Sequence, residues 1–170
     1  MPTCPTIETK HLHLRPYHMD DFQAYADFYA SDRAALMGQL NRRHAWYSFA
    51  SEAGTWALRG CGYWTVEHKA DQALAGHIGI LYNDHDPEPE LGWVVYPEYE
   101  GKGYAYEAAL AARDWLYENT PFEEFVSFIE GDNKRSIALA KRMGAVLDQS
   151  TNLDDPADSL YRHPKKKDLH

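Results

Sequence analysis

The chain has 170 residues, of which 44% are hydrophobic and 25% are charged, a composition typical of a globular protein. This length fits a single domain over residues 1–170 and leaves little room for a second. The 26 acidic residues outnumber the 17 basic ones, and the formal net charge of −9 argues against a protein that neutralises nucleic-acid phosphates. The same charge suits a cationic substrate, although acidity is also an ordinary feature of solubility.

The two cysteines, Cys4 and Cys61, lie far apart in the sequence. We therefore expect neither a disulfide framework nor a zinc site, and no metal cofactor. No apolar run approaches the roughly 20 residues needed to span a bilayer. The first residues also lack the basic-then-apolar pattern of a signal peptide. The sequence thus predicts a cytoplasmic protein without membrane or nucleic-acid partners.

Hydrophobic periodicity predicts seven strands and four helices along the chain. The predicted strands cover residues 11–15, 62–68, 74–82, 91–96, 125–130, 145–147 and 160–162. The predicted helices begin near residues 19–20, cover 43–58, follow Gly103 to about residue 116, and cover 134–143, where Gly144 is the expected C-cap. Strands that alternate with helices after an antiparallel run predict a mixed α/β sheet covered by helices.

The segment LGWVVYPEYEGKGYAYEAA joins a strand to a helix through Gly101 and Gly103. Two glycines let the backbone approach a ligand closely, and the unpaired N–H groups of the helix start favour a phosphate. The loop is therefore a candidate pyrophosphate cradle, and a tight turn without a ligand is the alternative. Neither the Rossmann nor the P-loop pattern fits, because residue 106 is Tyr106 rather than glycine and Tyr104 follows Gly103 directly.

A second segment, GDNKRSIALAKRMGA, places Asn133 and Ser136 three residues apart at the start of the last predicted helix. Capping of the helix by Asp132 or Asn133 would explain the asparagine by itself. A functional interpretation places the Asn133 amide against an amide-rich ligand and the Ser136 hydroxyl beside a leaving group. The two interpretations are compatible.

Together, ELGWVVYPEYEGKGYAYEAA and DNKRSIALAKRMGA resemble the acetyl-CoA-binding core of the GNAT acetyltransferases, and most closely the subgroup of ribosomal-protein N-terminal acetyltransferases (RimJ/RimL-like). The resemblance covers residues 74–147. It implies a mixed, mostly antiparallel sheet of about seven strands flanked by about four helices. It also implies direct transfer of an acetyl group from acetyl-CoA to an amine in a ternary complex. One departure is Glu98, where the family often has Gln or Arg.

The resemblance also implies roles for individual residues. The backbone of the central strand would hold the pantetheine arm like an added strand, the amides of the glycine loop would bind the pyrophosphate, and Asn133 and Ser136 would contact the pantetheine and the sulfur. The cofactor-binding residues expected on this basis are Val94, Val95, Gly101, Lys102, Gly103, Tyr104, Ala105, Asn133 and Ser136. Basic residues beside these segments could offset phosphate charge: Lys102, Lys134, Arg135, Lys141 and Arg142.

Acetyl transfer needs a neutral amine, a stabilised oxyanion and a donor to the departing sulfur. The N–H of Val95 would face the oxyanion, and Ser136 is the candidate donor to the sulfur. Glu90, at the entry to the central strand, is the candidate general base, although a solvated carboxylate is the alternative. His77 is a weaker candidate, and His85 lies in a polar loop that we expect to face solvent.

The acceptor cannot be identified from the sequence, and a protein N-terminus, a polyamine and an aminoglycoside remain open. Six acids and no Lys or Arg occur between residues 83 and 101, and they could attract a protonated amine: Asp84, Asp86, Glu88, Glu90, Glu98 and Glu100. Four aromatic residues could wall its pocket or belong to the core: Trp46, Tyr47, Trp56 and Trp64. A non-catalytic acyl-CoA sensor, a purely structural domain and a homodimer formed through the second helix are further alternatives.

Overall fold

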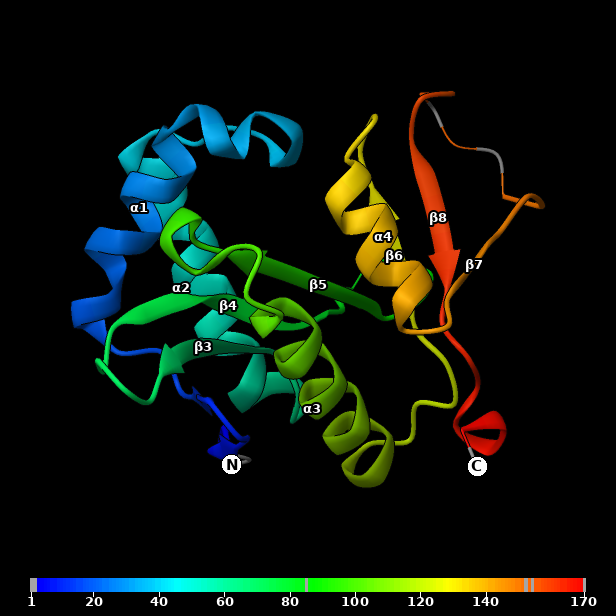
Figure 1. Cartoon of the computed structure of the whole chain (residues 1–170), viewed down its shortest axis with the longest axis horizontal. Coiled ribbons are helices and arrows are strands. Elements are labelled where there is room, and N and C mark those ends of the chain that lie inside the picture. Colours follow the sequence, from blue (N-terminus) through cyan, green and yellow to red (C-terminus); the bar gives the residue numbers. More distant parts are fainter. Residues whose placement is uncertain (1–2, 85, 152, 154, 170) are drawn as a thin grey trace.

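The computed structural model describes residues 3–84, 86–151, 153 and 155–169. Within this part of the chain, a sheet of eight strands has the order β1-β2-β3-β4-β5-β6-β8-β7 (Figure 1). All neighbouring strands are antiparallel except β5 and β6, which are parallel. The strands are β1 (Ile7–Glu8), β2 (Leu12–Arg15), β3 (Tyr63–His68), β4 (Leu74–Leu81), β5 (Glu90–Val95), β6 (Val126–Ile129), β7 (Val146–Leu147) and β8 (Ser159–Arg162). The predicted mixed, mostly antiparallel sheet is confirmed. The strand that the sequence did not predict is β1, whose two residues are too short for a periodic pattern.

The described residues form four α-helices, as predicted, and four short 3-10 helices. The α-helices are α1 (Phe22–Ala30), α2 (Arg42–Arg59), α3 (Tyr104–Asn119) and α4 (Lys134–Arg142). The 3-10 helices are η1 (Met19–Asp21), η2 (Asp32–Met37), η3 (Pro97–Tyr99) and η4 (Lys166–Asp168). Gly144 follows α4 with a φ of 85° and its N–H bonds to the Lys141 carbonyl, so it ends the helix as its sequence position predicts.

The largest core cluster lies between the sheet and α3. Small residues of α3 let it lie close to the sheet, where Leu91 of β5 and Leu116 of α3 are both 0% exposed. Truncating either leucine to alanine would cost about 2–5 kcal/mol, because it leaves a cavity. The helix that follows the glycine loop is therefore fixed against the central strands, and this contact sets where the loop lies.

The parallel pair β5 and β6 meets at one end and then diverges. The pairing between them joins Glu90 to Val126. One position further on, the Ser127 hydroxyl donates to the Leu91 carbonyl at 2.6 Å and lies 2.9 Å from Nε2 of His163. Since the single hydroxyl hydrogen goes to Leu91, Nε2 of His163 must donate to Ser127. Beyond this point the described residues show no further pairing of β5 with β6, and the start of α4 contacts β5 where the Trp93 indole N–H donates to Ser136.

Two simple sequence expectations can be compared with the described residues. Cys4 and Cys61 are both free thiols. No helix of the described part is both long enough and apolar enough to cross a membrane.

Candidate active site

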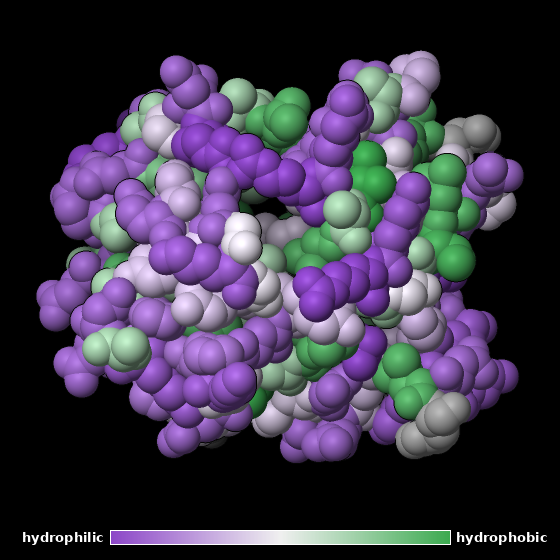
Figure 2. Space-filling view, in the orientation of Figure 1, coloured by the Kyte–Doolittle hydropathy of each residue, from purple (hydrophilic) through white to green (hydrophobic). Residues whose placement is uncertain are grey.

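A cavity of about 530 Å³ lies where β5 and α4 face each other. Its walls come from η2, the end of β5, the glycine loop with the start of α3, and the start of α4. Figure 2 shows this face of the molecule hollowed near its middle, with hydrophilic side chains around the opening. A smaller cavity of about 280 Å³ adjoins it, and the two share the residues Leu36, Met37, Trp93, Val94, Asn133 and Ser136. Ligands in the two cavities would therefore meet at this shared wall.

The glycine loop lines the larger cavity with backbone. Gly101 and Gly103 have φ values of 72° and 86°, which side chains disfavour. A Cβ added at either glycine would meet nothing within 4 Å, so both face open space. Gly103, Tyr104 and Ala105 all line the cavity at the N-terminus of α3, where unpaired N–H groups and the helix dipole favour an anion.

The side chain of one residue expected in this cradle, Lys102, points elsewhere. Lys102 is not part of the cavity wall. Its Nζ lies 5.1 Å from the centroid of the Tyr99 ring, a cation–π arrangement that turns the side chain away from the cavity. The side chain of Lys102 therefore packs against Tyr99, and a contact of its backbone amide with the cofactor stays a prediction.

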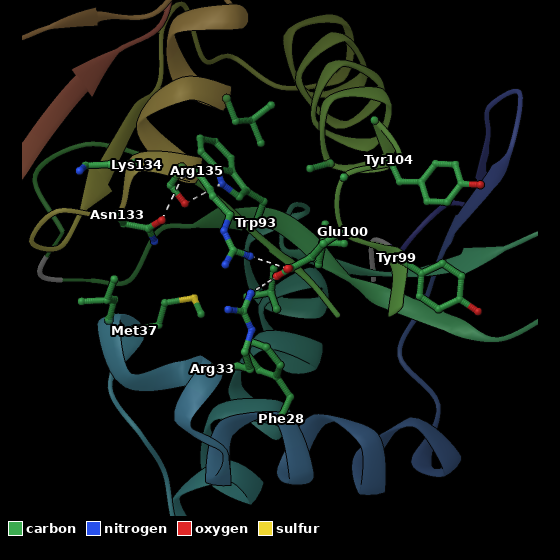
Figure 3. Close-up of a pocket in the computed structure, with 18 of the residues that line it drawn as sticks. Phe28, Arg33, Met37, Trp93, Tyr99, Glu100, Tyr104, Asn133, Lys134 and Arg135 are labelled. Carbon is green, nitrogen blue, oxygen red and sulfur yellow. Dashed lines mark hydrogen bonds and ion pairs between the residues drawn. The ribbon is translucent and has the colours of Figure 1, made fainter. Parts of the chain in front are cut away.

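The start of α4 supplies the polar groups of the shared wall (Figure 3). Oδ1 of Asn133 caps the helix by accepting from the Ser136 N–H at 3.2 Å, which leaves the Asn133 NH₂ group available. The Trp93 indole N–H donates to Oγ of Ser136 at 3.3 Å. Ser136 is thus held by an incoming hydrogen bond while its own hydroxyl hydrogen stays available for donation. Trp93 was not predicted, because its partner lies 43 residues away along the chain.

The backbone of β5 has a free edge towards the larger cavity. The Tyr96 N–H bonds to the Ala75 carbonyl on β4 at 2.8 Å. Since successive N–H groups along a strand point to opposite sides, the N–H of Val95 points away from β4. Val94 and Val95 both line the larger cavity, so this N–H is placed for a ligand lying along the strand.

An ion bridge crosses the larger cavity. Glu100, in the glycine loop, pairs with Arg33 of η2 and with Arg135 of α4, and all three residues line the cavity. Figure 3 shows the two arginines reaching Glu100 from opposite sides. Arg33 was not predicted, because it lies in a segment with no recognisable motif. Lys134 also lines this cavity.

Two of the other basic residues near the motifs do not line either cavity. Arg142 stacks at 3.9 Å from the centroid of the Tyr106 ring. Lys141 is exposed on α4 and outside both walls. Of the predicted basic residues, the larger cavity therefore has only Lys134 and Arg135 in the described wall.

Glu90 lies in the wall of the smaller cavity. The pKa of its carboxyl is raised to about 7, mainly by burial and also by the nearby carboxylates of Asp86 and Glu130, against one hydrogen bond from the Phe128 N–H at 3.4 Å. A carboxyl that titrates near neutral pH can accept a proton in the cell and pass it on. The structure thus places the predicted base candidate in the cavity and gives it a suitable pKa.

His77 also lines the smaller cavity, but its chemistry differs. Its Nε2 lies 3.2 Å from the Tyr29 hydroxyl, and its Nδ1 has no hydrogen-bond partner among the described residues. Burial lowers the pKa of His77 to about 3, so the ring stays neutral and is a weak base at neutral pH. His85 lies outside the described residues.

The four aromatic residues proposed as walls of the acceptor pocket line neither cavity. Trp56 and Trp64 are buried in the main core, where Trp64 points to the α3 side of the sheet. Trp46 and Tyr47 are 39% and 53% exposed on α2. The aromatic residues of the smaller cavity are instead Tyr29, Tyr63, Trp93 and Phe128.

The predicted acidic run is divided by the fold. Glu90 lines the smaller cavity and Glu100 the larger one. Glu88 pairs with Arg162, and Glu98 is exposed outside both cavities. An acid from outside the run, Glu130, joins Glu90 in the smaller cavity. No Lys or Arg occurs among the described residues of that cavity.

Residues 11–146 match a family model described as the GNAT acetyltransferase domain. The chain belongs to the GNAT acetyltransferase family. An acetyltransferase from Agrobacterium tumefaciens is 38% identical, with a TM-score of 0.89 and coverage of 95% of both chains. The ribosomal L7/L12 alpha-N-protein acetyltransferase RimL, solved with coenzyme A, shares the fold at 17% identity and a TM-score of 0.74, over 94% of this chain and 97% of that one. A spermidine N-acetyltransferase from Vibrio cholerae, solved with CoA and spermine, shares it at 14% identity and a TM-score of 0.73, over 94% and 98%.

Family membership makes this chain an acetyl-CoA-dependent acyltransferase, as the sequence predicted. The predicted GNAT family is confirmed, and RimL shares the fold with this chain at 17% identity. The two low-identity relatives are named for different acceptors, a ribosomal protein and a polyamine. The fold alone therefore leaves the acceptor open.

Proposed function

We propose that this chain, as a single domain, transfers the acetyl group of acetyl-CoA directly to a primary amine within a ternary complex. The observation that carries the proposal is the wall shared by the two cavities, which includes Val94 and Ser136. A cofactor in the larger cavity and an amine in the smaller one would meet at this wall, with the Glu90 carboxyl on the amine side.

The residues of the larger cavity fit coenzyme A. The open positions at Gly101 and Gly103 and the start of α3 suit a pyrophosphate, and Arg33 and Arg135 supply positive charge. The free edge of β5 suits the amide groups of a pantetheine arm. When bound, acetyl-CoA supplies the activated thioester carbonyl.

Three groups of the chain each assist one step of the acetyl transfer. A protonated amine first loses its extra proton to solvent, and Glu90 then accepts a proton from the nitrogen of the neutral amine as the C–N bond forms. The Val95 N–H stabilises the negative charge that develops on the carbonyl oxygen. As the C–S bond breaks, Ser136 donates its hydroxyl hydrogen to the sulfur and regains a proton from solvent. The proton on Glu90 returns to solvent, so the net products are an amide and a free thiol.

A cationic acceptor fits the smaller cavity best. Glu90 and Glu130 contribute carboxyl groups, and the described wall has no Lys or Arg to repel a protonated amine. A polyamine and a protein N-terminus both satisfy this requirement. The spermine complex of one fold relative and the protein acceptor of another support testing both classes.

A screen of amines tests this function. The purified protein is mixed with acetyl-CoA and, separately, with spermidine, an aminoglycoside, and a short peptide with a free N-terminus, and thiol release and product mass are measured. We expect an acetylated product from at least one of these amines. Binding of acetyl-CoA with no thiol release on any amine would overturn the catalytic proposal and favour a non-catalytic acyl-CoA sensor.

A further inference from the structure

Tyr63 reaches across two glycines to the central strand. In the sheet, Tyr63 of β3 lies opposite Gly79 of β4, and Gly79 lies opposite Gly92 of β5. A Cβ added at Gly92 would lie 2.0 Å from the Tyr63 hydroxyl oxygen and 3.3 Å from the ring carbon that carries it. The hydroxyl of Tyr63 therefore occupies the place that a side chain of residue 92 would fill.

This position lies within the smaller cavity. Alternate residues of a strand share a face, so Glu90, Gly92 and Val94 point to the same side of β5. The Tyr63 hydroxyl stands between the candidate base, Glu90, and the shared wall at Val94. Tyr63, Glu90, Gly92 and Val94 all line the smaller cavity.

The Tyr63 hydroxyl has no protein partner among the described residues, in contrast to neighbouring tyrosines. Tyr17 and Tyr25 donate to the Glu52 carboxylate at 2.6 and 2.7 Å, and Tyr29 pairs with His77. Burial raises the pKa of Tyr63 well above its ordinary value, so its phenol stays neutral. The hydroxyl is not among the fully buried polar atoms that lack a partner, so it faces the smaller cavity, where a ligand can reach it.

We propose that the Tyr63 hydroxyl binds the nitrogen of the acceptor beside Glu90 and selects primary over secondary amines. This inference rests on the proposed function and names the acceptor class of the same site. The geometry places two hydrogen-bond acceptors, the Glu90 carboxylate and the Tyr63 oxygen, on one cavity wall.

The selectivity follows from the fate of the two hydrogens on a neutral primary amine. One hydrogen leaves as a proton to Glu90, and the other remains on the nitrogen of the product amide. Tyr63 can accept a hydrogen bond from that second hydrogen throughout the reaction. A secondary amine keeps no hydrogen on nitrogen after transfer, so its transition state leaves the Tyr63 oxygen unpaired.

The test compares a reactive primary amine with its N-methyl analogue in the wild type and in Tyr63→Phe. We expect Tyr63→Phe to lower kcat/KM for the primary amine by about 10-fold, an effect of one hydrogen bond on the transition state. The N-methyl amine should change by less than about 2-fold, and the Kd for acetyl-CoA should not change. Equal losses for both amines, or no loss for either, would overturn the inference.

A second variant tests the geometry itself. Gly92→Ala places a methyl group where the Tyr63 hydroxyl lies, so it should lower kcat/KM for the primary amine in the wild-type background. In the Tyr63→Phe background the added loss should be at least about 3-fold smaller, because the hydroxyl is already absent. Gly54→Ala is the matched control, since a Cβ at Gly54 on α2 meets nothing within 4 Å. Additive effects of the two substitutions would overturn the placement of the hydroxyl.

The two proposals fail in different ways. A wild-type protein that acetylates no amine would overturn the proposed function and this inference together. An active wild type whose preference for primary amines is unchanged in Tyr63→Phe would overturn this inference alone.

Discussion

The larger and the smaller cavity are built from different parts of the chain. The larger one is lined mainly by two segments, residues 93–105 and 132–139, and includes Gly101 and Gly103, which face open space. The smaller one is lined by residues 90–94 and 127–130 of two neighbouring strands, together with side chains from α1, η2, β3, β4 and the start of α4. A cofactor held by backbone should tolerate many side-chain changes but not an added Cβ. An acceptor held by side chains should respond to the loss of a single polar atom.

The two cavities also differ in the charge of the residues that line them. Arg33, Lys134 and Arg135 bring positive charge to the larger cavity, where Glu100 partly offsets it. The smaller cavity has Glu90 and Glu130 without a cation among its described residues. An anionic cofactor and a cationic amine would thus be drawn to opposite ends of one continuous site.

The largest effect is expected from filling the cradle of the larger cavity. Gly103→Trp should weaken acetyl-CoA binding by at least about 100-fold, about 2.7 kcal/mol, because the indole would occupy the phosphate space and the φ of 86° is strained for any side chain. Calorimetric titration measures this change. Gly38→Trp is the control for strain alone, since Gly38 also has a positive φ, faces open space and lines neither cavity. Equal losses of affinity in both variants would contradict the assignment of the glycine loop as the site that binds the phosphates.

Glu90→Gln should impair the reaction of the amine in the smaller cavity without changing cofactor binding in the larger one. We expect kcat/KM for the amine to fall by about 100-fold while the Kd for acetyl-CoA stays within about 2-fold of the wild type. In the wild type, kcat/KM should rise with pH through about 7, because the Glu90 carboxyl with its raised pKa acts only when it is deprotonated. The glutamine variant should lose this dependence. An unchanged pH profile in Glu90→Gln would assign the base elsewhere.

Ser136→Ala should have a smaller effect at the shared wall. Turnover should fall by about 10-fold, because the departing sulfur loses a hydrogen-bond donor, and acetyl-CoA affinity should change by less than about 3-fold. Steady-state kinetics and calorimetry on the same preparation measure both quantities. A loss of affinity as large as the loss of turnover would make Ser136 a binding residue instead.

The smallest effect is expected at the ion bridge across the larger cavity. Glu100→Gln should tighten acetyl-CoA binding by about 2- to 5-fold, because it removes a negative charge beside the phosphates and frees Arg33 and Arg135. The difference should shrink at high salt. Glu98→Gln, in the same loop but exposed and outside the cavity, is the matched control. Weaker binding in Glu100→Gln would mean that Glu100 holds the arginines in place for the cofactor.

The difference between the two cavities also explains which features the sequence could predict. The helix-start motifs around Gly103 and Asn133 are local, so their spacing predicted the elements and most of the residues that line the larger cavity. Glu90 was predictable as a carboxyl at the start of a strand, but its pKa was not, because the burial that raises it comes from packing.

The groups that were missed depend on contacts between distant segments. Arg33 reaches Glu100 across 67 residues of sequence, and no local pattern marks it. Tyr63 gains its position only because Gly79 and Gly92 fall opposite it in the sheet, which requires the strand register. The sequence left open whether the four aromatic residues border a pocket or belong to the core, because periodicity does not tell which face of an element borders a cavity. A glycine within a predicted strand was the one signal that could have pointed to Gly92.

Calorimetric titration of the unmodified protein with acetyl-CoA tests the central claim most directly. The account predicts a Kd between about 1 μM and 1 mM, a free energy of about −8 to −4 kcal/mol. No heat of binding at millimolar acetyl-CoA would contradict the assignment of the larger cavity as the cofactor site.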